Sequence, residues 1–228
     1  MIVSHLHRFV FLKTKKTAGT SLEIALAGIC GPDDVITPIS PADETERRRL
    51  GHRGPQNLDP PRGRDPRQIL RSLRGRRRPR FRNHMPAVAV RRLLPSAVWE
   101  EYFTFCFDRN PWDRAVSLYH WLGGQPRFGS IAAFLCSGAE RPFSNYDRYA
   151  IDGVVGLDRV YRYEDMAGAL AEISRRLALP SPLSLPAHRA KGSVRTDGRH
   201  YREILEADER EWIAVVCARE IRLLGYEF

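Results

Sequence analysis

The sequence predicts an α/β fold with a mainly parallel central β-sheet flanked by helices. The apolar run Phe9–Leu12 has the pattern of a strand buried on both faces, and the aromatic-rich run Tyr102–Phe107 has the composition and length of a second strand. Each run is followed by small or polar residues and then by a helix-forming segment. Strands that alternate with helices favour a parallel sheet, so we expect an α/β fold.

The remaining elements are predicted from hydrophobic periodicity and from the positions of Gly, Pro and helix-capping residues. After the first strand, residues 13–21 form a turn, and Leu22–Ala27 form a helix that ends at Gly28. Residues 31–82 are rich in Pro and Arg and lack periodicity, which predicts a long, loosely structured excursion with a short helix at 67–73. Further expected elements are helices at 85–94, 111–122, 131–135 and 165–177, a strand at 160–163, and a final helix that starts at a capping box of Asp208 and Glu211, continues through Glu220 and closes at Gly225.

Length and composition indicate one globular domain. The chain has 228 residues, 43 % of them hydrophobic, so we expect a single domain over 1–228 with an Arg-rich insertion or acceptor loop at about 38–82.

The four cysteines have no metal-ligand or redox spacing and lie in apolar or small-residue stretches, which favours buried free thiols. The N-terminus lacks the long apolar core of a signal peptide, and no apolar run reaches 18 residues. We therefore expect a soluble, cytoplasmic protein without a transmembrane segment.

Most of the net charge of +10 comes from one segment. Between Asp43 and His84 there are 14 Arg and 5 acidic residues, whereas the rest of the chain is nearly neutral. Such a segment attracts an anionic partner, or it is a solvated insertion in an Arg-rich protein, since the chain has 33 Arg and 4 Lys. A specific nucleic-acid interface is not expected, because no recognised binding motif and no basic, aromatic-interleaved sheet is visible.

The turn after the first strand has the character of a phosphate or sulfate site. Thr17, Ala18, Gly19, Thr20 and Ser21 are small or hydroxylated and open a helix, whose N-terminal N–H groups and dipole attract anions. Lys16 adds a full charge, but it precedes the small residues, so the spacing differs from G-x-x-x-x-G-K-[ST]. A standard P-loop NTPase is therefore not expected, and a generic turn with solvated lysines is the alternative.

A second group of polar residues follows the second strand. Arg109 is expected at the carboxyl end of a central strand, where open α/β sheets bind ligands, and Ser117 lies about two helical turns farther on. A guanidinium and a hydroxyl together suit a phosphate monoester. The alternative is a surface Arg and a helix Ser that never meet.

The two segments together resemble sulfotransferases that use 3′-phosphoadenosine 5′-phosphosulfate (PAPS), in particular the carbohydrate-type branch. The first motif is matched by Lys15–Ser21 (KKTAGTS), and the second by Arg109–Tyr119 (RNPWDRAVSLY). Weaker similarities are Asn83–Ala87, Tyr163–Met166 and the closing Leu224–Phe228. The resemblance covers the chain apart from about 38–80 and 123–150, and it implies a P-loop nucleotide-kinase-like fold.

The resemblance also implies roles for individual residues. Lys16, with the backbone of Thr17–Ser21, would bind the 5′-phosphosulfate, and Arg109 with Ser117 would bind the 3′-phosphate. Lys191, Gly192, Ser193 and Arg195 would belong to a late loop that covers the nucleotide. No metal is implied, and the nucleotide product would be adenosine 3′,5′-bisphosphate (PAP).

Two positions depart from the motifs. Lys15 stands where the family usually has Pro, so both Lys15 and Lys16 are candidates for the catalytic lysine, and the register favours Lys16. Asp108 stands where an apolar residue is usual; it would either orient Arg109 or weaken its grip on phosphate.

The expected reaction is sulfuryl transfer to a hydroxyl, or to an amine, of a small-molecule or glycan acceptor that carries negative charge if the Arg segment steers it. Lys16 would stabilise charge on the leaving phosphate oxygen, and His84 would act as general base, with His188 as an alternative. Glu23 is expected to be a solvated or capping carboxylate. An ATP-dependent phosphotransferase and a nucleic-acid-binding protein are the competing functions, and neither the acceptor nor the oligomeric state can be predicted.

Overall fold

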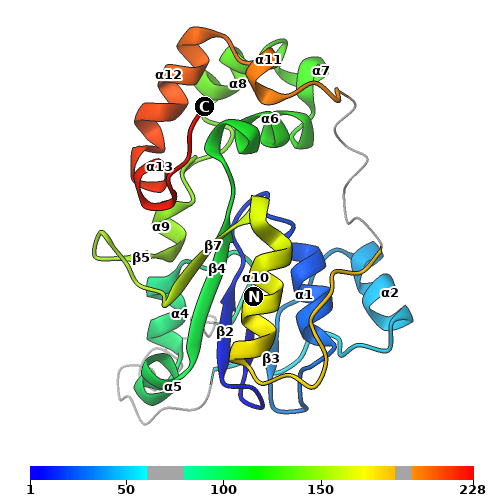
Figure 1. The fold of residues 1–228 in the computed structure, drawn as a ribbon. Helices are drawn as coiled ribbons and strands as arrows, with labels where there is room; N and C mark the ends of the chain where they lie inside the picture. The colour runs from blue at the N-terminus through cyan, green and yellow to red at the C-terminus, as the bar shows by residue number, and fades with distance from the viewer. Residues whose placement is uncertain (61–79, 188–196) are drawn as a thin grey trace, which may run out of the picture.

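A mixed five-stranded sheet forms the centre of the computed structural model, which describes residues 1–60, 80–187 and 197–228 (Figure 1). The strand order is β3-β1-β2-β4-β7. The strands are β1 (Ile2–Ser4), β2 (Phe9–Leu12), β3 (Val35–Ile36), β4 (Phe103–Asp108) and β7 (Arg159–Arg162).

The sheet corrects one part of the predicted fold. The β2–β4 and β4–β7 pairs are parallel, whereas β1 is antiparallel to both β2 and β3, so the sheet is mixed rather than mainly parallel. The α/β class and the flanking helices are confirmed. The sequence did not predict β1 because its three residues join β2 through a short turn, and such a hairpin strand has too few residues to show a period.

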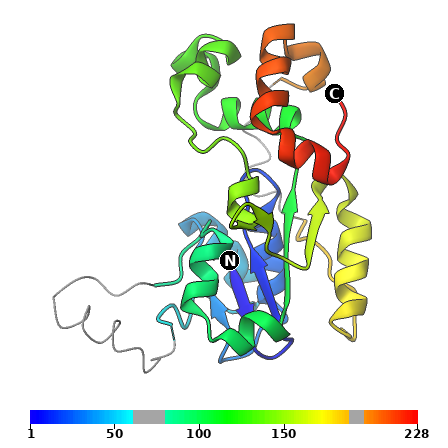
Figure 2. The same ribbon diagram turned by 90° about the vertical axis from the view of Figure 1, so that its left-hand side faces the viewer.

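Helices cover both faces of the sheet, as the edge-on view in Figure 2 shows. On one face, α1 (Gly19–Ala27) and α10 (Met166–Arg176) pack Leu22, Leu26 and Leu170 against aromatic side chains of β2 and β4. On the other face, α4 (Ala87–Leu93) and α9 (Tyr146–Tyr149) pack against Val10 and Leu12. Both faces of β2 are therefore buried, as its continuous apolar run predicted, and both faces of β4 are buried as well.

A third group of helices lies beyond the carboxyl end of β4 (Figure 1). It shares a core that includes Trp112, Phe134 and Tyr226, and we call it the helical cap. Its helices are α6 (Pro111–Trp121), α7 (Gly124–Phe128), α8 (Ile131–Ser137), α11 (Tyr201–Ile204), α12 (Ala207–Val216) and α13 (Ala218–Leu224). The carboxyl ends of β2 and β4 consequently face the junction between the sheet and the helical cap.

The other elements are α2 (Pro41–Arg49), α5 (Ser96–Glu101), a 3₁₀ turn (Tyr163–Asp165) and a hairpin of β5 (Ala150–Ile151) and β6 (Val154–Val155). The helix α2 lies in the excursion that was predicted to be loosely structured, where Ser40 caps its N-terminus and Pro41 opens it. The expected short helix at 67–73 lies outside the described residues. In the described part of the chain, no helix is long and apolar enough to cross a membrane.

Three local predictions were wrong in whole or in part. The capping box uses Glu206 and Glu209 instead of Asp208 and Glu211, and the final helix divides at Cys217 into α12 and α13. Three cysteines are buried free thiols as expected, but Cys136 is exposed because it lies on the outer side of the short helix α8.

Candidate functional site

The turn between β2 and α1 has a constrained backbone. Lys16 and Ala18 both adopt left-handed conformations, with φ of 61° and 54°. Ala18 is the N-cap of α1, and alanine has no side chain that can accept the first N–H groups of the helix. This geometry leaves the start of α1 suited to an anion, because N–H groups and the helix dipole both favour negative charge.

Lys13 was not predicted as a site residue, but its side chain anchors this turn to α1. Its side chain is 7 % exposed, and its Nζ lies 3.0 Å from Thr20 Oγ1 and 2.5 Å from Glu23 Oε2. Gly19 makes room for it, since a Cβ at that position would lie 2.6 Å from Lys13 Cγ. The lysine therefore ties the residue that follows β2 to the first two turns of α1.

The expectation that Glu23 is a solvated or capping carboxylate was wrong. Glu23 is fully buried, and its carboxylate accepts hydrogen bonds from Lys13, the Met1 ammonium and Thr37. Burial alone would raise the pKa of Glu23, but the positive charges of Met1 and Lys13 outweigh it and lower the pKa. The helix pattern alone could not show this burial, because the partners Met1 and Thr37 come from other segments of the chain.

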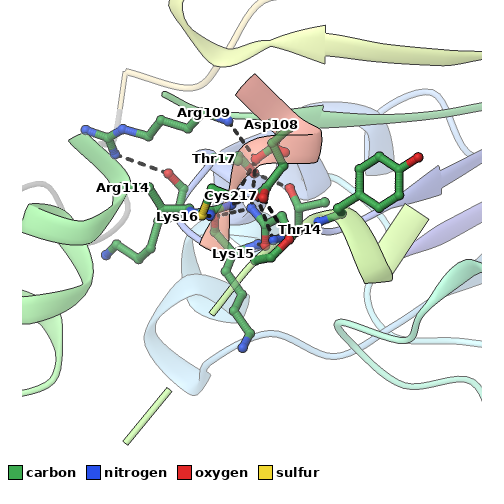
Figure 3. Close-up of polar contacts among 12 residues, drawn as sticks. Thr14, Lys15, Lys16, Thr17, Asp108, Arg109, Arg114 and Cys217 are labelled. Atoms are coloured by element: carbon green, nitrogen blue, oxygen red, sulfur yellow. Dashed lines mark hydrogen bonds and ion pairs between the residues drawn. The ribbon is translucent and has the colours of Figure 1, made fainter. Parts of the chain in front are cut away.

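The two candidate lysines point in different directions (Figure 3). The Lys15 ammonium pairs with Glu140 and donates to Pro142 O at 3.3 Å. The Lys16 ammonium lies 4.8 Å from the ring centre of Trp121, at the end of α6. Figure 3 shows the Lys16 side chain extending to the same side as that of Arg109.

The structure brings Arg109, Ser117 and Lys16 together. One guanidinium nitrogen of Arg109, Nη1, donates to Lys16 O at 3.1 Å and lies 3.5 Å from Ser117 Oγ. The rest of the guanidinium pairs with Asp113 at 2.6 Å and stacks 4.6 Å from the ring centre of Tyr163. The alternative in which Arg109 and Ser117 never meet is therefore wrong. Asp113 balances part of the Arg109 charge, so an incoming phosphate would share the guanidinium with it.

Asp108 acts on Arg109 through the backbone. Its carboxylate accepts the Arg109 N–H at 2.8 Å and pairs with Arg114 at 3.2 Å, and it makes no ion pair with the Arg109 guanidinium. It is fully buried at the end of β4, and burial raises its pKa to about 6 against the opposing effect of Arg114. Tyr149 donates a further hydrogen bond at 2.8 Å. Asp108 thus fixes the chain where β4 turns into α6.

His84 contacts the turn at its first residue, Lys13. Its Nδ1 is 3.1 Å from Lys13 O, and a carbonyl oxygen can only accept, so the bonded Nδ1 carries the proton and Nε2 is left as an acceptor. Arg148 donates to His84 O at 2.7 Å. Burial, followed by the charges of Lys13 and Arg148, lowers the pKa of His84 to about 4, so the ring is neutral near pH 7.

A cavity of about 480 Å³ lies between the helical cap and the segment 138–147. Aromatic side chains of Phe134, Phe143 and Trp212 line it together with Glu140, the partner of Lys15. Glu140 is thus the residue that connects this cavity with Lys15, and the cavity volume is within the range of small-ligand pockets.

The late-loop residues Lys191, Gly192, Ser193 and Arg195, as well as His188, lie outside the described residues. So do residues 61–79 of the Arg-rich segment.

Comparison with known proteins leaves the family open. No protein-family model matches the chain. It is similar to an "Uncharacterized protein" of Archaeoglobus fulgidus, with 27 % identity over 126 residues, which are 53 % of this chain and all of that relative.

Proposed function

We propose that this protein is a sulfotransferase that moves a sulfuryl group from PAPS to a hydroxyl or amine of a small-molecule or glycan acceptor. The observation that carries the proposal is the 3.1 Å contact between Arg109 Nη1 and Lys16 O. It joins the turn after β2 to the turn after β4, two neighbouring parallel strands. One ligand with two separate anionic groups would engage both turns, and PAPS has that arrangement.

The side chains at this junction suit such a ligand. Lys16 and the backbone of Thr17–Ser21 would hold the 5′-phosphosulfate at the start of α1. Arg109 and Ser117 would hold the 3′-phosphate, for which a guanidinium and a hydroxyl are strong donors. Lys15 is already paired with Glu140, which supports the assignment of Lys16 as the catalytic lysine.

When bound, the nucleotide supplies a sulfuryl group whose bond to the bridging phosphate oxygen breaks while a bond from sulfur to the acceptor oxygen forms. Lys16 and the first N–H groups of α1 would stabilise the negative charge on the bridging oxygen. His84 is neutral near pH 7 and has an unprotonated Nε2, so it would take the acceptor proton.

Calorimetric titration with PAP tests the proposal. We expect binding by the wild type, at least tenfold weaker binding by Arg109→Gln, and unchanged binding by the control Arg92→Gln, since Arg92 is exposed on α4. Transfer of labelled sulfate to an acceptor library should occur with the wild type and be lost in Lys16→Met.

Two results would replace the proposal. A preference for ATP with Mg²⁺ over PAP would indicate a phosphotransferase. Binding to polynucleotides in place of PAP would indicate a nucleic-acid-binding protein.

A further inference from the structure

Asn145 is a buried residue that no sequence pattern singled out, and it contacts both halves of the candidate site. It directly precedes α9 and is 0 % exposed. Its side chain makes no capping hydrogen bond to α9, although asparagine commonly has that role at such a position. The amide is used elsewhere.

The Asn145 amide pairs with the backbone of Lys15 in both directions. Lys15 N–H donates to Asn145 Oδ1 at 3.1 Å, and Asn145 Nδ2 donates to Lys15 O at 3.1 Å. The two bonds fix the residue directly before Lys16, in the way a neighbouring strand would.

The same amide reaches the end of β4. Asn145 Nδ2 donates its second hydrogen to Asp108 Oδ1 at 2.9 Å, and Asp108 in turn accepts the backbone N–H of Arg109. The Asn145 backbone N–H is anchored to Glu220 of α13 at 2.8 Å. One side chain therefore spans the two turns that carry Lys16 and Arg109, from an anchor in the helical cap.

We propose that Asn145 is a positioning residue for the donor site: it fixes the Lys15 backbone relative to Asp108, and so sets the spacing between Lys16 and Arg109. This inference rests on the proposed function, because that spacing matters for a ligand with two anionic groups. Both N–H groups and the oxygen of the amide are engaged, so no other side chain of similar size can make the same three bonds.

The test compares Asn145→Ala with Ser144→Ala. Ser144 is a matched control, because it is buried, its hydroxyl donates to the same Glu220 at 2.7 Å and accepts from Tyr146 N–H, and neither bond involves residues 13–18. Three quantities are measured: amide hydrogen exchange of residues 13–18 without ligand, the Kd for PAP, and the separate KM values for donor and acceptor.

We expect Asn145→Ala to exchange faster at residues 13–18 and to bind PAP about tenfold more weakly, since it lacks all three amide hydrogen bonds. The donor KM should rise, while the acceptor KM stays within twofold. Ser144→Ala should lower the unfolding midpoint but match the wild type in exchange at 13–18 and in PAP affinity. A folded Asn145→Ala protein that behaves like Ser144→Ala would overturn the proposal.

A second variant serves if the alanine protein does not fold. Asn145→Asp has the same shape and still accepts the Lys15 N–H, but at pH 8 its carboxylate donates to neither Lys15 O nor Asp108. The charged or titratable groups around it are Asp108, Glu220, Arg114, Tyr149 and Lys15. Its PAP affinity should be reduced at pH 8 and should recover in part at pH 5.5, where the new carboxyl and Asp108 share a proton; wild-type affinity at pH 8 would refute the inference.

The two proposals fail separately. If wild-type protein does not bind PAP, the proposed function is wrong, whereas hydrogen exchange at residues 13–18 still decides whether Asn145 holds the turn.

Discussion

The buried pair of Lys13 and Glu23 allows a quantitative test of how the turn is held. Replacing Glu23 by Leu removes the carboxylate but leaves the Lys13 ammonium, 7 % exposed, and the fully buried Met1 amino group, whose pKa burial lowers to about 6. Removing one partner of a buried ion pair typically costs about 3–5 kcal/mol. Both amino groups keep hydroxyl or amide acceptors, Thr20 for Lys13 and Thr37 and Asn83 for Met1, so we expect a cost near 3 kcal/mol.

The converse variant, Lys13→Met, leaves Glu23 with two of its three partners. The loss of one charge-assisted hydrogen bond predicts a cost of about 2 kcal/mol. The double variant should cost less than the sum of the two single variants by at least about 1 kcal/mol. Each single variant leaves the other member of the pair as a buried charge, whereas the double variant removes both.

Equilibrium urea unfolding at pH 7, followed by far-UV circular dichroism, measures all three free energies. The exposed pair of Arg8 and Glu101, with side chains 58 % and 57 % exposed, is the control, and Glu101→Gln should change stability by at most about 1 kcal/mol. Single costs below 1 kcal/mol, or additivity within about 0.5 kcal/mol, would refute the view that this pair holds the turn. The lowered pKa of Glu23 means that its contribution is present above its unfolded pKa and is lost as the pH falls through the lower folded value.

Four further predictions concern individual positions. Because the pKa of His84 is lowered to about 4, kcat/KM for the acceptor should show no decline near pH 6.5 and should fall only toward pH 4; an acid limb at pH 6.5 would exclude His84 as the base. The same shift predicts that stability decreases as the pH falls from 6.5 toward 4, and that the decrease is smaller in His84→Ala. Gly19→Ala should destabilise the fold by about 1–3 kcal/mol in urea titrations, because its Cβ would lie 2.6 Å from Lys13 Cγ, whereas Gly31→Ala, whose nearest contact would be 3.4 Å, should change stability little. In the native protein, a maleimide should label Cys136 and leave the other three cysteines unmodified. Label that mass spectrometry finds on Cys30, Cys106 or Cys217 would contradict the burial of those thiols.

Local sequence patterns predicted the parts of this fold that depend on local physics. The strand β2 was predictable because its short continuous apolar run is typical of a strand buried on both faces, and β4 because it is rich in aromatic residues and has the usual strand length. The positions of Lys16 and Arg109 followed, since parallel strands end at one edge. The sequence also predicted that β2 and β4 are neighbouring strands. The antiparallel strand β1 could not be predicted, because a strand of three residues shows no hydrophobic period.

Residues that act across large separations could not be predicted in this way. Glu23 has an ordinary place in a helix pattern, and its partners Met1 and Thr37 come from other segments. Asn145 lies in a stretch without a motif, 130 positions from Lys15 and 37 from Asp108. Only the tertiary structure reveals that these side chains share one site.

The contacts made by Lys13 and Asn145 bear on how the site would bind a nucleotide. Left-handed conformations at Lys16 and Ala18 cost about 1 kcal/mol or more each, and they persist only where surrounding contacts enforce them. Those contacts are formed when the protein folds, so ordering of the turn does not have to accompany ligand binding, and preorganisation of this kind increases affinity. Loss of Glu23 or of Asn145 should therefore weaken PAP binding, although neither side chain is expected to contact the nucleotide. Across these variants, the loss of PAP affinity should correlate with the increase in hydrogen exchange at residues 13–18.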